Sequence, residues 1–130
     1  FDLVTEKGLK IEVKSSAYIQ SWHQKTYSNI VFGIRPTYSW NYENNQLEGK
    51  RKRQADIYVF CLLKHKDQKT INPLDASQWC FYVVLTKQID KICPKSKSLS
   101  LKRVKKLGAI ECDYSRLKEV IKDLENICSN

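Results

Sequence analysis

The first fourteen residues, FDLVTEKGLKIEVK (1–14), decide the fold that we expect for this chain. Two runs in this segment, FDLVT and LKIEVK, alternate between apolar and polar side chains, which is typical of β-strands. They are separated by EKG, and Gly8 can adopt the left-handed backbone that closes a three-residue hairpin loop. The segment therefore predicts a β-hairpin in which Leu3 lies opposite Ile11.

The same register places Asp2 opposite Glu12. Because side chains alternate across a strand, one face of the hairpin is expected to be apolar and the other charged. The apolar face carries Leu3, Leu9, Ile11 and Val13, and the charged face carries Asp2, Lys10, Glu12 and Lys14.

The charged face brings two carboxylates and an ammonium together on a rigid pair of strands. Carboxylate oxygens suit Mg²⁺, which polarises a phosphoryl oxygen and lowers the pKa of a bound water. Lys14 could orient that water or stabilise developing charge. These residues predict phosphodiester hydrolysis, with Asp2, Glu12 and Lys14 as the catalytic group. The alternative is that this face is only the solvated edge of an amphipathic strand, since Glu-x-Lys alone is a weak motif.

The rest of the chain indicates an α/β fold built on a central mixed β-sheet. Residues 29–35 (NIVFGIR) predict a third strand, and 37–53 predicts a long surface loop. The segments 55–63 and 78–85 are so continuously apolar that both of their faces should be covered. Helices are expected on the flanks of the sheet, at 98–108, where Gly108 stops the helix, and at 113–128.

The length, charge and cysteine content of the chain indicate which classes of binding partner are expected. The 130 residues are enough for a single domain, and the formal charge of +9 favours a polyanion, with nucleic acid first. No apolar run is long enough to span a membrane, and we expect no membrane partner. Five widely spaced cysteines favour free thiols in a reducing cytoplasm. Because the chain opens on FDLV without an initiator Met, we expect a fragment that lacks the N-terminal part of a longer protein.

The stretch DLVTEKGLKIEVKSS resembles the D-x(n)-E-x-K hairpin of the PD-(D/E)XK, or restriction-endonuclease-like, nuclease superfamily. The resemblance implies a restriction-endonuclease-like sheet flanked by helices and a DNA endonuclease that uses Mg²⁺, with Mn²⁺ as a substitute. It also implies that Asp2, Glu12 and the Val13 carbonyl bind the metal, and that Lys14 assists the attacking water. Phe1 stands where the family often has Pro, and the family's upstream acidic ligand is absent from these residues.

A longer run of segments, from IEVKSSAYIQSWHQK to NPLDASQWCFYV, is similar to bacterial proteins of restriction or phage-defence loci. This second resemblance favours DNA as the substrate. A homodimer would suit the cutting of both strands, but no segment predicts an interface. The runner-up is a non-catalytic DNA- or RNA-binding module on a nuclease-like fold, followed by a small scaffold protein.

Several polar residues are candidates for contacting DNA. The densest basic run can neutralise consecutive phosphates, although a solvated loop is the alternative. Further candidates follow the hairpin, where a helix at 17–27 would direct two glutamines toward the site. The DNA-binding set is Ser15, Gln20, Gln24, Lys50, Arg51, Lys52, Arg53 and Gln54.

Three further features of the sequence are weaker indications of function. His23 is a conceivable general base, but a metal-bound water makes one unnecessary. The spacing of Gln54 and Tyr58 matches a Q-x-x-x-Y pattern of some nucleases, which we interpret as coincidence. Aromatic residues near the basic run could stack on unpaired bases, although packing against the sheet is the commoner outcome. They are Trp22, Tyr27, Tyr38, Trp40 and Tyr42.

Overall fold

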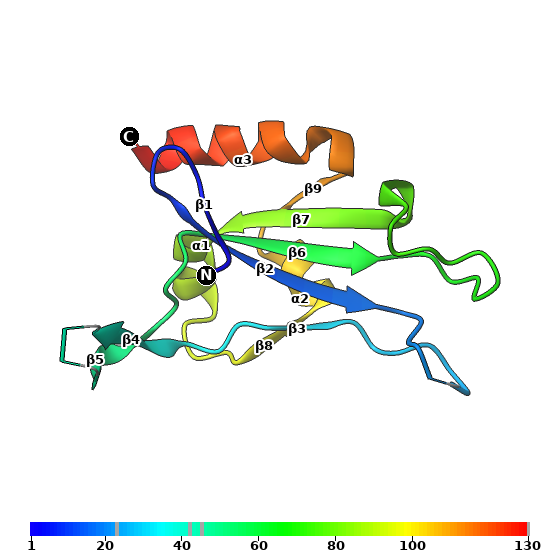
Figure 1. Ribbon diagram of the computed structural model, residues 1–130, viewed down its shortest axis with the longest axis horizontal. Coiled ribbons are helices and arrows are strands. Elements are labelled where there is room, and N and C mark those ends of the chain that lie inside the picture. The colour runs from blue at the N-terminus through cyan, green and yellow to red at the C-terminus, as the bar shows by residue number, and fades with distance from the viewer. Residues whose placement is uncertain (23, 42, 45, 130) are drawn as a thin grey trace.

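The computed structural model, which describes residues 1–22, 24–41, 43–44 and 46–129, has a five-stranded mixed sheet at its centre (Figure 1). The strand order is β1-β2-β6-β7-β9, and β2 and β6 are the parallel pair. The strands span Leu3–Val4, Lys10–Ala17, Ile57–Leu63, Trp79–Leu85 and Ile110–Cys112. The predicted α/β class and mixed central sheet are confirmed.

The N-terminal hairpin forms in the predicted register. Leu3 pairs with Ile11, and the turn is closed by Gly8 with a φ of 85°. The two-sided alternation is only partly confirmed, because Ile11 is buried whereas Leu3 and Val13 are 57% and 37% exposed. The reason is positional, since β1 and β2 lie at the edge of the sheet, where little covers their apolar face (Figure 1).

The neighbouring strands β6 and β7 are covered on both faces, as their apolar runs predict. One face packs against helix α3 (Tyr114–Ser129) through Val120 and Leu124. The other face packs against a second layer that includes α1 (Thr86–Ile92) and α2 (Leu101–Lys106). Each of these two strands therefore contributes alternate side chains to two separate apolar clusters, one on each face of the sheet.

The second layer also holds a small sheet that corrects one strand prediction. Within 29–35, only β3 (Val31–Gly33) is a strand, and it pairs with β8 (Ser98–Ser100) rather than with the central sheet. Ile30, Phe32 and Ile34 are buried beneath the central sheet. The alternation of buried and exposed residues was readable from the sequence, but the partner strand was not.

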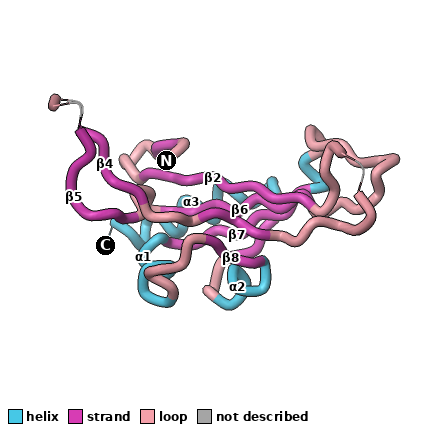
Figure 2. Tube along the Cα trace, turned by 90° about the horizontal axis from the view of Figure 1, so that it is seen from below, coloured by secondary structure: helices cyan, strands magenta, loops and turns pink. Residues whose placement is uncertain are grey.

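The expected surface loop at 37–53 is wrong. This segment forms an antiparallel hairpin of β4 (Thr37–Asn41) and β5 (Gln46–Lys52), which projects from the body of the protein (Figure 2). Gly49 has a φ of 77° inside β5. The polar composition is compatible with strands here because both faces of a projecting hairpin can be solvated. Tyr42 and His23 lie outside the described residues.

The helix predictions hold in part. The C-terminal helix is confirmed as α3, but the expected helix at 98–108 is shortened to α2 because Ser98–Ser100 pairs as β8. Ser100 caps α2 by accepting a hydrogen bond from the Arg103 N–H. The expected helix at 17–27 is wrong, since β2 extends to Ala17 and the described residues after it are irregular. In the part of the chain that the structure describes, no helix is long and apolar enough to cross a membrane.

Candidate active site

Glu12 and Lys14 lie on the same face of β2 and form an ion pair. The Lys14 Nζ is 3.2 Å from Glu12 Oε1, and the α-ammonium of Phe1 is 3.0 Å from Glu12 Oε2. The Glu12 side chain is 19% exposed and that of Lys14 is 37% exposed. The carboxylate is thus charge-paired with Lys14 while remaining within reach of a ligand from solvent.

Asp2, the residue before β1, contacts the same strand. Its Oδ2 accepts a hydrogen bond of 2.8 Å from the Val13 N–H, and its own N–H donates to the Ile11 carbonyl at 2.8 Å. Because the N–H and C=O of one residue in a strand point to the same side, the Val13 carbonyl also faces the edge that Asp2 occupies. The four residues predicted from the sequence therefore lie close together in the paired part of the hairpin. They are Asp2, Glu12, Val13 and Lys14.

Tyr58 is a neighbour of this group that the sequence analysis set aside. It pairs with Glu12 in the parallel register of β2 and β6, so the two side chains share a face. Burial, followed by the negative charge of Glu12, raises the pKa of the Tyr58 phenol to about 12, and Arg53 opposes this rise. The phenol therefore stays neutral beside Glu12 well above physiological pH. The Q-x-x-x-Y spacing did not predict this contact, because Gln54 lies away from the site at the base of the β4–β5 hairpin and the pairing of Tyr58 with Glu12 depends on the sheet register.

Arg53 does not lie in an exposed basic run. Its side chain is 1% exposed and pairs with Asp90. Its guanidinium also donates to backbone carbonyls of Ile34 at 2.9 Å and Ser96 at 2.6 Å. The expectation of an exposed, DNA-contacting Arg53 conflicts with this burial, because the fork of donors is already used to join three segments.

The remaining residues of the basic run have different surroundings. Lys50, Arg51 and Lys52 are exposed on β5, and the Arg51 guanidinium lies 5.2 Å from the centre of the Tyr38 ring. Gln54 precedes β6 and its Nε2 donates to the carbonyls of Thr37 and Lys52 at the base of the hairpin. Three of the four consecutive basic side chains are thus presented on a projecting two-stranded arm.

The other three DNA-binding candidates are separated from one another. Ser15 is exposed on the α3 side of β2, the face opposite to Glu12. Gln20 and Gln24 lie in the irregular segment after β2, where the Gln20 N–H donates to Gln24 Oε1 at 2.9 Å and Gln24 Nε2 donates to Ser28 at 2.8 Å. The two glutamines brace their own loop and do not point toward the carboxylates from a helix.

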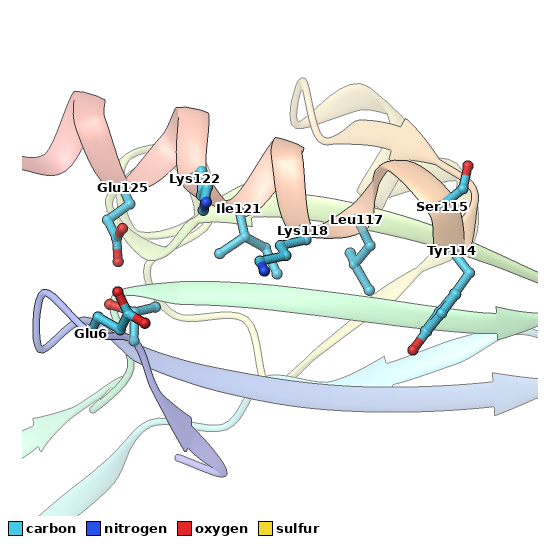
Figure 3. Close-up of a pocket in the computed structure, with 9 residues that line it drawn as sticks. Glu6, Tyr114, Ser115, Leu117, Lys118, Ile121, Lys122 and Glu125 are labelled. Atoms are coloured by element: carbon cyan, nitrogen blue, oxygen red, sulfur yellow. The ribbon is translucent and has the colours of Figure 1, made fainter.

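A groove of about 560 Å³ lies between α3 and the β1–β2 turn (Figure 3). Figure 3 shows Lys118, Lys122 and Ile121 projecting from α3 over this space, with Glu6 on the opposite wall. The groove is on the α3 side of the sheet, whereas Glu12 and Lys14 are on the other side, with Tyr58. It is therefore a feature distinct from the candidate active site.

The residues at this site that could hold a divalent ion are oxygen donors. Asp2 and Glu12 supply two carboxylates, and the Val13 carbonyl faces the same edge. Among the described residues no cluster of three or more His, Cys, Asp or Glu side chains could hold a metal. Two carboxylates are enough for Mg²⁺, which retains several waters and is commonly bound through one or two of them.

Comparison with known proteins identifies a family. The family model described as bacteriophage T4 endonuclease IV matches residues 1–103. No curated protein and no solved structure matches this chain. The matched region covers the hairpin that carries Asp2, Glu12 and Lys14, the β4–β5 arm, and strands β6 and β7.

Proposed function

Since the chain belongs to the bacteriophage T4 endonuclease IV family, and hence to a family of nucleases, we propose that it hydrolyses DNA phosphodiester bonds with a divalent metal ion at the N-terminal hairpin. The single observation that carries the proposal is the convergence of Asp2, Glu12 and Lys14 on the β1–β2 pair. We further propose that this arrangement is a PD-(D/E)XK site on a restriction-endonuclease-like core. The β1–β2 hairpin and its parallel neighbour β6 support that assignment.

Each residue has a separate part in the proposed reaction. Asp2, Glu12 and the Val13 carbonyl would hold Mg²⁺, or Mn²⁺ in its place, and the bound ion supplies charge neutralisation at the phosphate and a more acidic water. Lys14 is on the same face as Glu12 and would orient the attacking water or stabilise the charge that develops on the phosphoryl oxygens. Glu12 keeps Lys14 in place by its ion pair.

We assign DNA binding to the positively charged side chains of the protein. The exposed Lys50, Arg51 and Lys52 on the projecting arm would contact phosphates on one side of the hairpin. A two-stranded ribbon is narrow enough to enter a major groove, which would also give the arm access to base edges. A restriction or phage-defence role and a cytoplasmic location remain predictions from the sequence.

A non-catalytic DNA- or RNA-binding module is the second candidate. The observation that favours it is that Glu12 pairs with Lys14 and Asp2 accepts a backbone N–H, so both carboxylates have structural partners. In that case the charge of +9 would bind a polynucleotide without cutting it.

Cleavage of supercoiled plasmid DNA distinguishes the two candidates. The parent protein is expected to nick DNA with Mg²⁺ or Mn²⁺ and to stop when the ions are chelated. Glu12→Gln should abolish nicking, and Lys14→Ala should slow it about 100-fold or more, the usual effect of removing one group that stabilises transition-state charge. Lys10→Ala is the matched control, because it removes the same charge from the same strand and should cleave like the parent.

The opposite outcome is equally clear. If the parent shifts DNA in a gel but never cuts it with either ion, and Glu12→Gln binds as tightly as the parent, the binding module replaces the nuclease. If nicking survives in both Glu12→Gln and Lys14→Ala, the activity belongs to another part of the surface and this assignment of the site is wrong.

A further inference from the structure

Two loops lie side by side beyond the carboxyl ends of the parallel strands β2 and β6 (Figure 1, right side). The first follows β2 at residues 18–28, and the second follows β6 and begins at Lys64. They are joined by a hydrogen bond of 3.1 Å from the Tyr27 hydroxyl to the Lys66 carbonyl. Between them is a cleft of about 550 Å³, lined by Ile19, Gln24, Lys25, Thr26, Tyr27, Lys66 and Gln68.

The cation in this cleft is held by aromatic rings. The Lys66 Nζ lies 4.4 Å from the centre of the Tyr18 ring and 5.4 Å from that of Tyr27. The two rings meet edge to face with their centres 6.4 Å apart. Cation–π contacts of this kind restrict a lysine that would otherwise sample many rotamers, so the positive charge is placed before any ligand arrives.

The loop that carries the rings is braced from within. Gln20 Nε2 donates to the Ala17 carbonyl at 3.0 Å, and Gln24 links the Gln20 N–H to Ser28. The Ser28 N–H donates to the Tyr18 carbonyl at 2.9 Å and closes the loop. The two glutamines therefore fix the position of Tyr18 and Tyr27 relative to the end of β2.

The charge and the exposed rings indicate what the cleft binds. Residues 18–28 and 64–70 contain four lysines and one acidic residue, Asp67, whose Oδ1 accepts the Lys69 N–H in its own turn. Tyr27 is 54% exposed and Trp22 is 62% exposed. Lysines interleaved with exposed aromatic faces are typical of surfaces that bind a polynucleotide, since the cations neutralise phosphates and the rings stack on bases.

We propose that this cleft binds a nucleotide of the substrate strand at a distance from the scissile phosphate. The proposal rests on the function assigned above and adds a second anchor to it: Lys25 and Lys66 contact phosphate, and Tyr27 stacks on a base. β2 connects the two places directly, because Lys14 and Ala17 are on the same strand. At the rise of a strand Lys14 is ~10 Å from the end of β2, where the loop that lines the cleft begins, so a strand bound in the cleft is several nucleotides from the scissile phosphate.

The anchor is tested first by binding, without cleavage. A fluorescent oligodeoxynucleotide is titrated with the protein in the presence of a chelator, and its anisotropy gives the Kd. Tyr27→Ala should weaken binding about tenfold through lost stacking. Lys66→Gln should weaken it and lower the salt dependence, the slope of log K against log salt, by about one phosphate contact.

Two variants keep this test specific. Tyr27→Phe keeps the ring but loses the hydrogen bond to Lys66, and it should bind within about twofold of the parent because stacking is retained. Lys122→Gln removes an exposed lysine from α3, on the other side of the sheet, and should bind like the parent. Thermal unfolding of each variant identifies any loss caused by misfolding. The proposal is overturned if correctly folded Tyr27→Ala and Lys66→Gln both bind like Lys122→Gln.

The proposed nucleotide-binding cleft and the proposed active site are tested independently of each other. If Glu12→Gln and Lys14→Ala abolish cleavage but Tyr27→Ala binds normally, the cleft is wrong and the active site stands. If no variant of the hairpin affects cleavage but Tyr27→Ala and Lys66→Gln lose affinity, the cleft stands and the active site is wrong. If the cleft and the active site are both assigned correctly, Tyr27→Ala should raise the KM for DNA and leave kcat within about twofold, since the cleft contacts no reacting atom.

Discussion

At the scale of single residues, similar side chains in one short run have opposite environments. Lys50, Arg51 and Lys52 are exposed, whereas the adjacent Arg53 is buried among backbone carbonyls and Asp90. Glu12 is likewise charge-paired and adjacent to the neutral phenol of Tyr58. The function of a charged residue here depends on which segment covers it.

The first residue-scale prediction concerns Arg53. Arg53→Ala should lower the free energy of unfolding by ~3 kcal/mol, because it leaves several buried carbonyls without a donor. Arg53→Lys should recover only part of this loss, since an ammonium cannot reproduce the guanidinium fork. Asp90→Asn should cost less, ~1 kcal/mol or below, because the Asp90 side chain is 50% exposed. Urea denaturation measures all three, and a stability of Arg53→Ala equal to that of the parent would contradict the structural role.

The second concerns Tyr58 and alkaline pH. Its pKa rises to about 12 in the folded protein, from an ordinary value of 10.0, so the folded state retains a proton that the unfolded state loses. The contribution of Tyr58 to the free energy of unfolding is constant below pH 10. The free energy of unfolding then falls as the pH rises from 10 toward 12. The difference is at most ~3 kcal/mol, because each pKa unit corresponds to ~1.4 kcal/mol. Tyr58→Phe removes only the hydroxyl, and its unfolding free energy should fall less steeply over that range. Parallel curves for the two proteins would exclude Tyr58 as a source of the slope.

At the scale of elements, the chain carries two positive regions, the β4–β5 arm and the cleft between the loops after β2 and β6. They lie toward opposite ends of the long axis, with the hairpin strand β2 between them (Figure 1). A polynucleotide that contacts both regions would pass along β2 and therefore past Glu12 and Lys14. The arrangement of elements thus supports both proposals.

The element-scale prediction concerns the arm. Lys50→Gln combined with Lys52→Gln should lower the slope of log K against log salt by about two, one for each lost phosphate contact. Lys105→Gln combined with Lys106→Gln is the matched control, since it removes two exposed lysines from α2 and should leave the slope unchanged. Filter binding between low and high salt gives both slopes. Equal slopes for the two double variants would mean that the arm is only a solvated hairpin.

At the scale of the whole molecule, the core is formed without disulfides. All five cysteines are free, and four of them are buried in the two apolar clusters. Burial raises the pKa of the Cys61 thiol to about 11, which suppresses the reactive thiolate. These cysteines serve as small apolar side chains in the sheet.

The whole-molecule prediction concerns thiol reactivity. Alkylation of the native protein at pH 8, followed by mass spectrometry, should modify one residue, Cys128, which is exposed on α3. All five thiols should react after denaturation. Rapid labelling of Cys61 or Cys80 in the native protein would show that the sheet opens easily, contrary to the packing described. The possible homodimer remains a prediction from the sequence. Light scattering of the native protein would measure its molecular mass in solution.

The amino-acid sequence by itself determined the local features of this protein. The alternation and the glycine at position 8 were enough to predict the β1–β2 hairpin and its register, and the continuous apolar runs were enough to predict two fully covered strands. The three- and four-residue spacing of apolar side chains predicted α3. These signals are local, because each depends on residues that are close in the chain.

Only the tertiary structure decided the features that join distant segments. It showed that β3 pairs with β8, that 37–53 is a hairpin, and that Arg53 is buried beneath a segment some forty residues later. It also placed Tyr58 beside Glu12 and brought Tyr27 to Lys66. Side-chain alternation indicates which residues can face a core but does not identify the segment that covers them, because strand pairing and burial depend on contacts between residues far apart in the chain.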